Sequence, residues 1–342
     1  MIIVHEINQL AYGGVERIIR NIIAFDKKNE HIVCSYKDGP FRKELEAVGA
    51  KVIIATEEDI SVSADIIHIH SGGAASKMAK DLSSMFPVIE TIHSPVRSAV
   101  LNKDVFQRVG VCKEVSRINH DCITILNGLD FYALHPTKHP EEIKKELGIP
   151  EGVPVIGRLG RVARDKGLEE WILACADLQK KGFNFTPLIV GEEFEPGYRG
   201  TLKLMCESLP LKNVIWVGHR DDVGNLYQII DIFLYPSATE GFGLVFAEAL
   251  YSGCQVVTWN TPVTRELFGG VAFMAEKANI AELSEVTEMV LRSTEVEGDA
   301  RPLLEEHYSG KRMSEQYQEL YESSYENFIK ENKPQAEHLV SA

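Results

Sequence analysis

Long apolar runs are absent from this 342-residue sequence, and none approaches the roughly 18 consecutive apolar residues of a membrane-spanning helix. The chain also starts without a basic segment or a cleavage site, because residues 1–4 already have the composition of a strand, so we predict no secretory signal. Its six cysteines are scattered and form no C-x-x-C pair. This pattern argues against a disulfide framework or a zinc site and is typical of reduced cytoplasmic thiols. We therefore expect a cytoplasmic protein.

Positive charge is also scarce. The net charge of −14 divides into −2 over the first 130 residues and −12 over the rest, and a sequence-independent nucleic-acid binder needs a basic face. We expect no nucleic-acid partner. This charge balance does not exclude a local basic patch in the near-neutral first half. We interpret one segment there as a solvated helix, and the alternative is an acceptor-facing or peripheral inner-membrane edge. Its cations are Arg97, Lys103, Arg108, Lys113 and Arg117.

Several signatures of catalysis are missing as well. There is no G-x-x-x-x-G-K-[ST] loop for nucleoside triphosphates, no G-x-G-x-x-G after the first strand, no H-E-x-x-H and no G-x-S-x-G. His68 and His70 alternate along one expected strand and so share a face. No third ligand is evident beside them, so we attribute them to burial and predict no metal site.

What the sequence does have is an alternation of short Val- and Ile-rich strands with helical segments, and this occurs twice. The alternation begins at residue 1, stops in a proline-containing stretch at 131–154 that we interpret as a connection, and restarts at 153. From about residue 302 the pattern is only helical. Such alternation predicts α/β units with parallel sheets, whose ligands bind at the carboxyl ends of the strands.

The sharpest candidate site follows the expected strand at 231–236. A loop with Gly241 and Gly243 leads into a helix, so backbone N–H groups and the positive helix end could hold a diphosphate. Glu248 lies in the otherwise apolar start of that helix and needs a polar partner, which sugar hydroxyls would supply. The alternative is an ordinary strand–loop–helix turn with Glu248 at a domain edge.

Four cations gather at the end of the strand that begins the second half, namely Arg158, Arg161, Arg164 and Lys166. Cations in such a loop suit a diphosphate leaving group, although exposed basic residues often serve solubility only. In the first half, Gly13 and Gly14 form a turn before the first helix. His93 ends an expected strand, where a lone histidine is more often structural than catalytic.

These segments together resemble the retaining GT-B glycosyltransferases of the family often called group 1, or family 4. The resemblance implies two doubly wound Rossmann-like domains that face a central cleft, and an E-x7-E element at Glu240 and Glu248. We predict an acceptor-side domain at 1–135, a linker at 136–152, a donor domain at 153–314 and a helix at about 315–333 that packs back on the first domain. The matching segments are 13–16, 65–70, 91–94, 125–130, 160–167, 188–192, 214–223, 231–250 and 261–269.

The resemblance also implies roles for particular residues. Glu240 would contact the transferred sugar, Glu248 the ribose hydroxyls, and the amides of residues 242–245 the donor phosphates, while His93 would approach the sugar. Arg158 falls three residues before the family's diphosphate-binding pair and is expected to be structural. The implied catalytic residues are His93, Glu240, Arg161 and Lys166, and the implied donor-binding residues are Gly14, Arg161, Lys166, Val217, Arg220, Glu240, Gly241, Phe242, Gly243, Leu244, Val245 and Glu248.

The family reaction transfers a sugar from a nucleoside diphosphate to an acceptor hydroxyl with retention of anomeric configuration. The sequence shows no obvious carboxylate pair for double displacement, which favours a same-face substitution that needs neither a metal nor a cofactor. On family frequency we favour a UDP-sugar donor and a glycan, glycolipid or small-molecule acceptor in polysaccharide or glycolipid synthesis. The alternatives are a nucleotide-sugar 2-epimerase and a non-catalytic nucleotide-sugar-binding subunit.

Overall fold

The computed structural model describes residues 1–55, 63–70, 76–96, 104–293 and 298–336, which divide into two compact units. Unit 1 comprises residues 1–130 together with the tail from residue 307, and unit 2 comprises residues 131–306. The sequence analysis places the corresponding boundaries near residues 135 and 314. Within the described ranges, no helix combines the length and the apolar character needed to cross a membrane.

Unit 1 is built on a parallel sheet of seven strands in the order β3-β2-β1-β4-β5-β6-β7. The chain winds outward from β1 to β3, then crosses to β4 and winds outward in the other direction, so its switch point lies between β1 and β4. The strands are β1 Ile2–Ile7, β2 Glu30–Ser35, β3 Lys51–Ile54, β4 Ile66–Ile69, β5 Val88–Ile92, β6 Gln107–Gly110 and β7 Cys122–Thr124.

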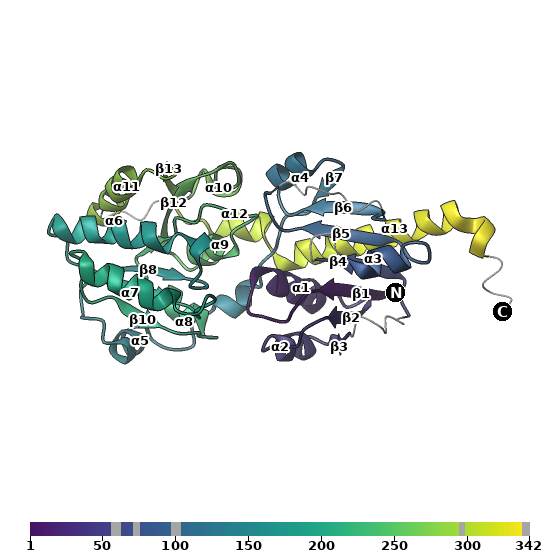
Figure 1. Cartoon of the computed structure of the whole chain (residues 1–342), viewed down its shortest axis with the longest axis horizontal. Helices are drawn as coiled ribbons and strands as arrows, with labels where there is room; N and C mark the ends of the chain where they lie inside the picture. The colour runs from purple at the N-terminus through teal and green to yellow at the C-terminus, as the bar shows by residue number, and fades with distance from the viewer. Residues whose placement is uncertain (56–62, 71–75, 97–103, 294–297, 337–342) are drawn as a thin grey trace. The chain divides into compact units, whose positions relative to one another are not determined.

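The helices of unit 1 bury apolar faces against this sheet. In α1, Ile18, Ile19, Ile22 and Ile23 recur at helical spacing and are all buried, as the sequence predicts. The tail helix α13, drawn in yellow, runs along this unit and packs against α1 (Figure 1). The helices are α1 Gly14–Phe25, α2 Arg42–Ala47, α3 Lys77–Leu82, α4 Lys113–Asn119 and α13 Gly310–Ala336.

Unit 2 repeats the doubly wound plan with a parallel sheet of six strands in the order β10-β9-β8-β11-β12-β13. Here the switch point lies between β8 and β11, whose carboxyl ends are therefore the expected ligand-binding edge. The strands are β8 Val155–Leu159, β9 Thr186–Val190, β10 Ile215–Val217, β11 Ile232–Leu234, β12 Gln255–Asn260 and β13 Phe273–Glu276.

The core of unit 2 lies between this sheet and its helices, with the indoles of Trp171 and Trp259 fully buried in it. Its α-helices are α5 Pro140–Leu147, α6 Leu168–Lys180, α7 Tyr198–Ser208, α8 Val223–Tyr227, α9 Leu244–Tyr251, α10 Pro262–Phe268, α11 Ile280–Arg292 and α12 Arg301–His307. The last of these, α12, ends at the unit boundary. Its short 3-10 helices are Phe131–Leu134 and Arg164–Lys166.

The predicted α/β class with two doubly wound, Rossmann-like units is confirmed, but the sequence analysis missed β6 and β13. The basic segment expected as one helix instead contains β6 and the separate helix α4. Within it, Arg108 lies in β6 and pairs with Glu90 of β5 at 3.3 Å, and Arg117 pairs with Glu114. Arg97 and Lys103 lie outside the described residues.

Candidate functional site

The switch point of unit 2 brings together two residues that are 74 positions apart in the sequence. Lys166 follows β8 and Glu240 follows β11, and Lys166 Nζ donates to Glu240 Oε1 over 2.9 Å. Ser237 Oγ donates to the same carboxylate oxygen over 2.7 Å. Both charged side chains are largely covered, with exposed fractions of 15% and 14%, so the pair forms at a partly desolvated strand end.

The charge on Lys166 is held by this carboxylate. Burial alone would lower the pKa of the Lys166 amine, but the attraction and hydrogen bond of Glu240 outweigh burial and raise the pKa above its ordinary value. Asp165 adds a further contact at 3.2 Å. A lysine that stays charged at a strand end is suited to an anionic ligand.

Two glycines shape the loops that carry this pair. Gly167 has φ +64°, and a Cβ there would lie 2.0 Å from the carbonyl oxygen of Pro236, so the loops after β8 and β11 approach each other backbone to backbone. Gly243 has φ +81° and precedes α9 without offering a side chain to cap its first amides. The predicted strand–glycine loop–helix arrangement after residue 236 is therefore confirmed.

Glu248 lies one turn inside α9 and is buried, as its apolar neighbours predict. The hydroxyl of Tyr227, from α8, donates to Glu248 Oε2 over 2.8 Å. The polar partner that the sequence requires for this carboxylate is thus present within the protein. The tyrosine hydrogen bond fixes the position of this carboxylate at the start of α9.

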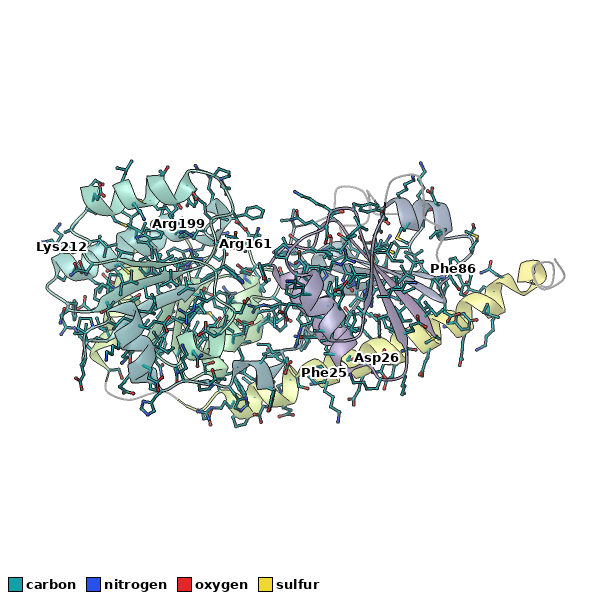
Figure 2. All side chains as sticks on the ribbon, turned by 90° about the horizontal axis from the view of Figure 1, so that it is seen from below. Phe25, Asp26, Phe86, Arg161, Arg199 and Lys212 are labelled. Atoms are coloured by element: carbon teal, nitrogen blue, oxygen red, sulfur yellow. The ribbon has the colours of Figure 1, made fainter. Side chains whose placement is uncertain are left out.

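The other three cations of this strand end, one within β8 and two in the loop after it, are dispersed. Arg158 is fully buried with its guanidinium 4.7 Å from the ring centre of Tyr235, and burial lowers its pKa. Arg164 pairs with Glu195 at 3.1 Å. Arg161, labelled in Figure 2, stacks on Phe194 at 4.3 Å and forms no ion pair with a described residue, which leaves its charge available to an anion.

Two further expected donor-binding residues, Val217 and Arg220, lie at the end of β10 and just beyond it. Val217 is the last residue of that strand and is partly buried. Arg220 donates to Asp222 Oδ1 over 2.7 Å and to Glu146 Oε1 over 2.5 Å, and these hydrogen bonds raise its pKa. Its guanidinium is therefore already committed to two carboxylates.

In unit 1, the two expected site residues lie at the carboxyl ends of strands or just beyond them. Gly14 opens α1 in the connection after β1, and His93 directly follows β5. His93 Nε2 lies 3.2 Å from His70 Nδ1, and burial lowers the pKa of His93 to about 4. His93 is therefore neutral near pH 7.

A third histidine that was not predicted from the sequence lies beside His68 and His70. His5, in the neighbouring strand β1, pairs in register with His68, and ring nitrogens of the three lie within 4.8 Å of one another. The statement that no third candidate ligand accompanies His68 and His70 is thus wrong. The signal was present in the sequence, because His5 occupies the equivalent position in the first strand, but the strand order was needed to interpret it.

Residues 140–301, almost all of unit 2, match the family described as glycosyl transferases group 1. Unit 2 is a group 1 glycosyltransferase domain. The chain is 30% identical over 187 residues to the capsular polysaccharide biosynthesis glycosyltransferase CapM of Staphylococcus aureus, a match that covers 52% of this chain and 47% of CapM. The chain spans about half the length of the curated relatives it matches first.

Solved structures share the architecture over nearly the whole chain. A glycosyltransferase from Rickettsia africae ESF-5 has a TM-score of 0.82 at 20% identity and covers 95% of this chain and 99% of its own. Anabaena Alr3699/HepE in complex with UDP-glucose has a TM-score of 0.81 at 19% identity and covers 94% and 100%. These likenesses show the fold, and the predicted GT-B class is confirmed.

Proposed function

We propose that this chain is a retaining glycosyltransferase that moves a sugar from a nucleoside-diphosphate sugar, with a UDP-sugar favoured, to an acceptor hydroxyl in polysaccharide or glycolipid synthesis. The observation that carries the proposal is the Lys166–Glu240 pair at the switch point of a group 1 glycosyltransferase domain. The favoured donor is supported by the UDP-glucose bound to HepE, and the pathway class by the name of CapM.

In this proposal the diphosphate meets Lys166, Arg161 and the amides at the start of α9. Glu240 accepts hydrogen bonds from hydroxyls of the transferred sugar, and Glu248 binds the ribose hydroxyls. The segment from Val217 to Arg220 lies along the base through its backbone and apolar atoms, since the Arg220 guanidinium has other partners. Residues 241–243 let the backbone approach the phosphates, and Leu244 and Val245 supply the first helical amides. The sequence resemblance implies that His93 and Gly14 also contact the donor, and we keep both as proposed site residues.

The proposed chemistry is a substitution on one face of the sugar. The bond between the anomeric carbon and the donor phosphate oxygen breaks, the bond to the acceptor oxygen forms, and the acceptor proton passes to the departing phosphate oxygen. Lys166 and Ser237 hold Oε1 of Glu240, and in this proposal the carboxylate orients the sugar and does not attack it. The residues act through positioning and through cations near the charge that develops on the phosphate.

The direct test is a screen of nucleotide release. The full chain is incubated with common UDP- and GDP-sugars, each with and without a panel of acceptor glycans, glycolipids and small alcohols, and the products are identified by mass spectrometry. We expect release of UDP that depends on an acceptor, together with an acceptor whose mass increases by one sugar. Acceptor-independent UDP release with a free isomerised sugar would identify an epimerase instead, and donor binding without turnover would identify a non-catalytic subunit.

We also propose that the transfer needs no metal, because Lys166 and Arg161 provide the positive charge beside the diphosphate. Initial rates should then be unchanged after the protein is incubated with excess EDTA and assayed in its presence. Rates with added Mg²⁺ or Mn²⁺ provide the control for indirect effects of the chelator. Activity that disappears in EDTA and returns with one of these ions would contradict metal independence.

A further inference from the structure

A continuous line of imidazoles crosses the interior of unit 1. It starts at the buried carboxylate of Asp26, directly after α1 (Figure 2), where His31 Nε2 lies 3.1 Å from Asp26 Oδ2. His31 Nδ1 lies 3.0 Å from His5 Nε2, and His5 Nδ1 lies 3.1 Å from His70 Nε2. His70 Nδ1 then meets His93 Nε2 at 3.2 Å. The line therefore joins Asp26 to a residue that we assign to the donor site.

The sheet itself creates this line. The four histidines come from β2, β1, the end of β4 and the end of β5, which are adjacent strands in that order. His5 pairs in register with Val33 of β2 and with His68 of β4. His31 therefore lies two residues before the β2 position opposite His5. His70 lies two residues after the β4 position opposite His5. Side chains two residues apart share a face of the sheet, so each step moves one strand across and two residues toward the carboxyl edge.

Asp26 determines which nitrogens carry protons. Burial alone would raise the pKa of Asp26, but the His31 contact and hydrogen bonds from Asn29 and the Lys28 amide outweigh burial and lower it to about 2. A carboxylate can only accept, so the His31 nitrogen beside it must carry a proton. The contact is close but is not a well-aligned hydrogen bond, and a lone pair placed there would be repelled by the carboxylate.

The proton on His31 Nε2 then sets the donor and acceptor of every hydrogen bond along the line. A neutral imidazole has one N–H and one lone pair, so a histidine that donates through Nε2 must accept through Nδ1. Burial lowers the pKa values of His5 and His70 well below the ordinary value, and His5 is wholly inaccessible to solvent. Each histidine in turn accepts from the Nε2–H of the next. His93, the last, donates to His70 and keeps a lone pair on Nδ1.

We propose that Asp26 is a positioning residue that sets the tautomer of His93 through three intervening histidines, so that His93 presents Nδ1 as a hydrogen-bond acceptor. Because this deepens the proposed function, His93 would accept a hydrogen bond from a substrate hydroxyl and could not donate one through that atom. Within the described part of the chain, His70 is the hydrogen-bonding partner found for His93, so Nδ1 remains for a ligand.

A metal site built from His5, His68 and His70 is the competing interpretation, since their nitrogens lie within 4.8 Å of one another. The hydrogen-bond partners argue against it. His68 directs Nδ1 to the hydroxyl of Tyr321 at 2.8 Å and Nε2 to that of Thr91 at 2.7 Å. His5 and His70 direct nitrogens at each other, and a shared proton leaves only one of that pair with a lone pair.

The proposal is tested first on the unmodified full chain. Nitrogen-15 NMR of histidine-labelled protein at pH 8 distinguishes Nδ1–H from Nε2–H imidazoles through long-range proton couplings, with signals assigned by single His→Gln variants. We expect the Nε2–H tautomer at all four residues of the line. An Nδ1–H tautomer or an imidazolium at any of them would overturn the proposal. So would metal bound to the purified protein and lost in His5→Gln.

The second test reverses the line. In Asp26→Asn, the side-chain oxygen keeps the amides of Lys28 and Asn29, so the new NH2 group faces His31 and must donate to it. Every hydrogen bond should then reverse, with His93 changing to Nδ1–H and no change in net protonation. Asp65→Asn is the matched control, because that carboxylate accepts from the Ile2 amide in the same sheet but lies outside the line. We expect no tautomer change in the control.

Asp26→Asn also loses the hydrogen bond that Asn29 Nδ2 donates to Asp26 Oδ2, so the fold of this variant is checked by circular dichroism. The nitrogen-15 NMR spectrum of the wild type tests the proposal independently of any variant. An unchanged His93 tautomer in folded Asp26→Asn would overturn the proposal.

Enzyme activity tests a separate point, which is the role of His93 in the proposed function. If His93 accepts from a substrate hydroxyl, kcat/KM should fall about tenfold in Asp26→Asn and not in Asp65→Asn. A reversed tautomer with full activity would instead contradict the role of His93 in the proposed function.

Discussion

Lys166 and Glu240 neutralise each other at the end of two strands and are largely covered, but exposed fractions of 15% and 14% keep them within reach of solvent. A ligand with its own negative charge can therefore compete for Lys166 while its hydroxyls take over the hydrogen bonds of Glu240. Both with and without the ligand, Lys166 then faces a negative charge and Glu240 accepts hydrogen bonds. At the scale of single residues, this makes the pair a preformed site whose two halves suit a phosphate and a sugar.

Replacement of Lys166 by Ala removes the cation nearest to Glu240 and should lower kcat by on the order of 100-fold or more, through lost stabilisation of the leaving phosphate. Lys212→Ala is the matched control, because Lys212 is exposed in the same unit and its described hydrogen bonds use its backbone. Steady-state rates of UDP release measure both variants. Equal rates for Lys166→Ala and the wild type would remove Lys166 from the mechanism.

At the scale of elements, the site depends on how closely two loops approach each other. The loop after β8 and the loop after β11 touch at Gly167 and Pro236, and this contact places Lys166 opposite Glu240. Neither partner could be identified from the sequence as a contact, because a glycine close to the end of a helix is also common where nothing lies near it. Gly182, with φ +91° and no atom within 4 Å of a Cβ, is such a case.

Alanine substitutions at Gly167 and Gly182 allow a direct comparison of stability. An alanine at either position adopts a left-handed conformation that costs about 1–2 kcal/mol. Gly167→Ala also forces a Cβ against the Pro236 carbonyl, which should lower the free energy of unfolding by about 1–3 kcal/mol more than Gly182→Ala does. Urea unfolding followed by tryptophan fluorescence compares the two. A similar loss of stability in both variants would show that the loops separate without cost.

The elements that the sequence predicts well are those with a clear apolar pattern, such as β1, α1 and β11. β6 was missed because its sequence, QRVG, contains a single large apolar residue, and its place in the sheet depends on pairing with β5 and on the Arg108–Glu90 contact. The loop after β11 was predicted from its glycines alone. The histidine line could not be predicted, since it depends on strand order and register rather than on any local motif.

At the scale of the whole molecule, the two units should respond differently to acid. His5, His68, His70 and His93 are held neutral in folded unit 1 because burial lowers their pKa values. Once unfolded, they regain pKa values near 6.5 and take up protons below that pH. The unfolded state then binds more protons than the folded state. The free energy of unfolding of unit 1 should therefore fall as the pH decreases below 6.5, by up to about 1.4 kcal/mol per pH unit for each histidine.

The predicted window extends from pH 6.5 down to about 4, where folded His93 itself becomes protonated. All three tryptophans, Trp171, Trp216 and Trp259, lie in unit 2, where the histidines of the described residues are exposed. Urea unfolding at pH 7.5 and 5.0 should therefore show an earlier transition by circular dichroism at the lower pH, with little change in the fluorescence transition. If both signals shift together by the same amount, the two units unfold as one.

The tail helix α13 has a consequence for synthesis. Its Tyr317 and Tyr321 hydroxyls contact Thr91 and His68 in the middle of the first sheet, and Ser314 donates to the carbonyl of Ile22 in α1. Unit 1 therefore lacks part of its interior until α13 leaves the ribosome. Unit 2, although encoded later than residues 1–130, has all of its residues available earlier. Residues 1–130 are thus translated before unit 2, but unit 1 can finish folding only after unit 2 has been translated.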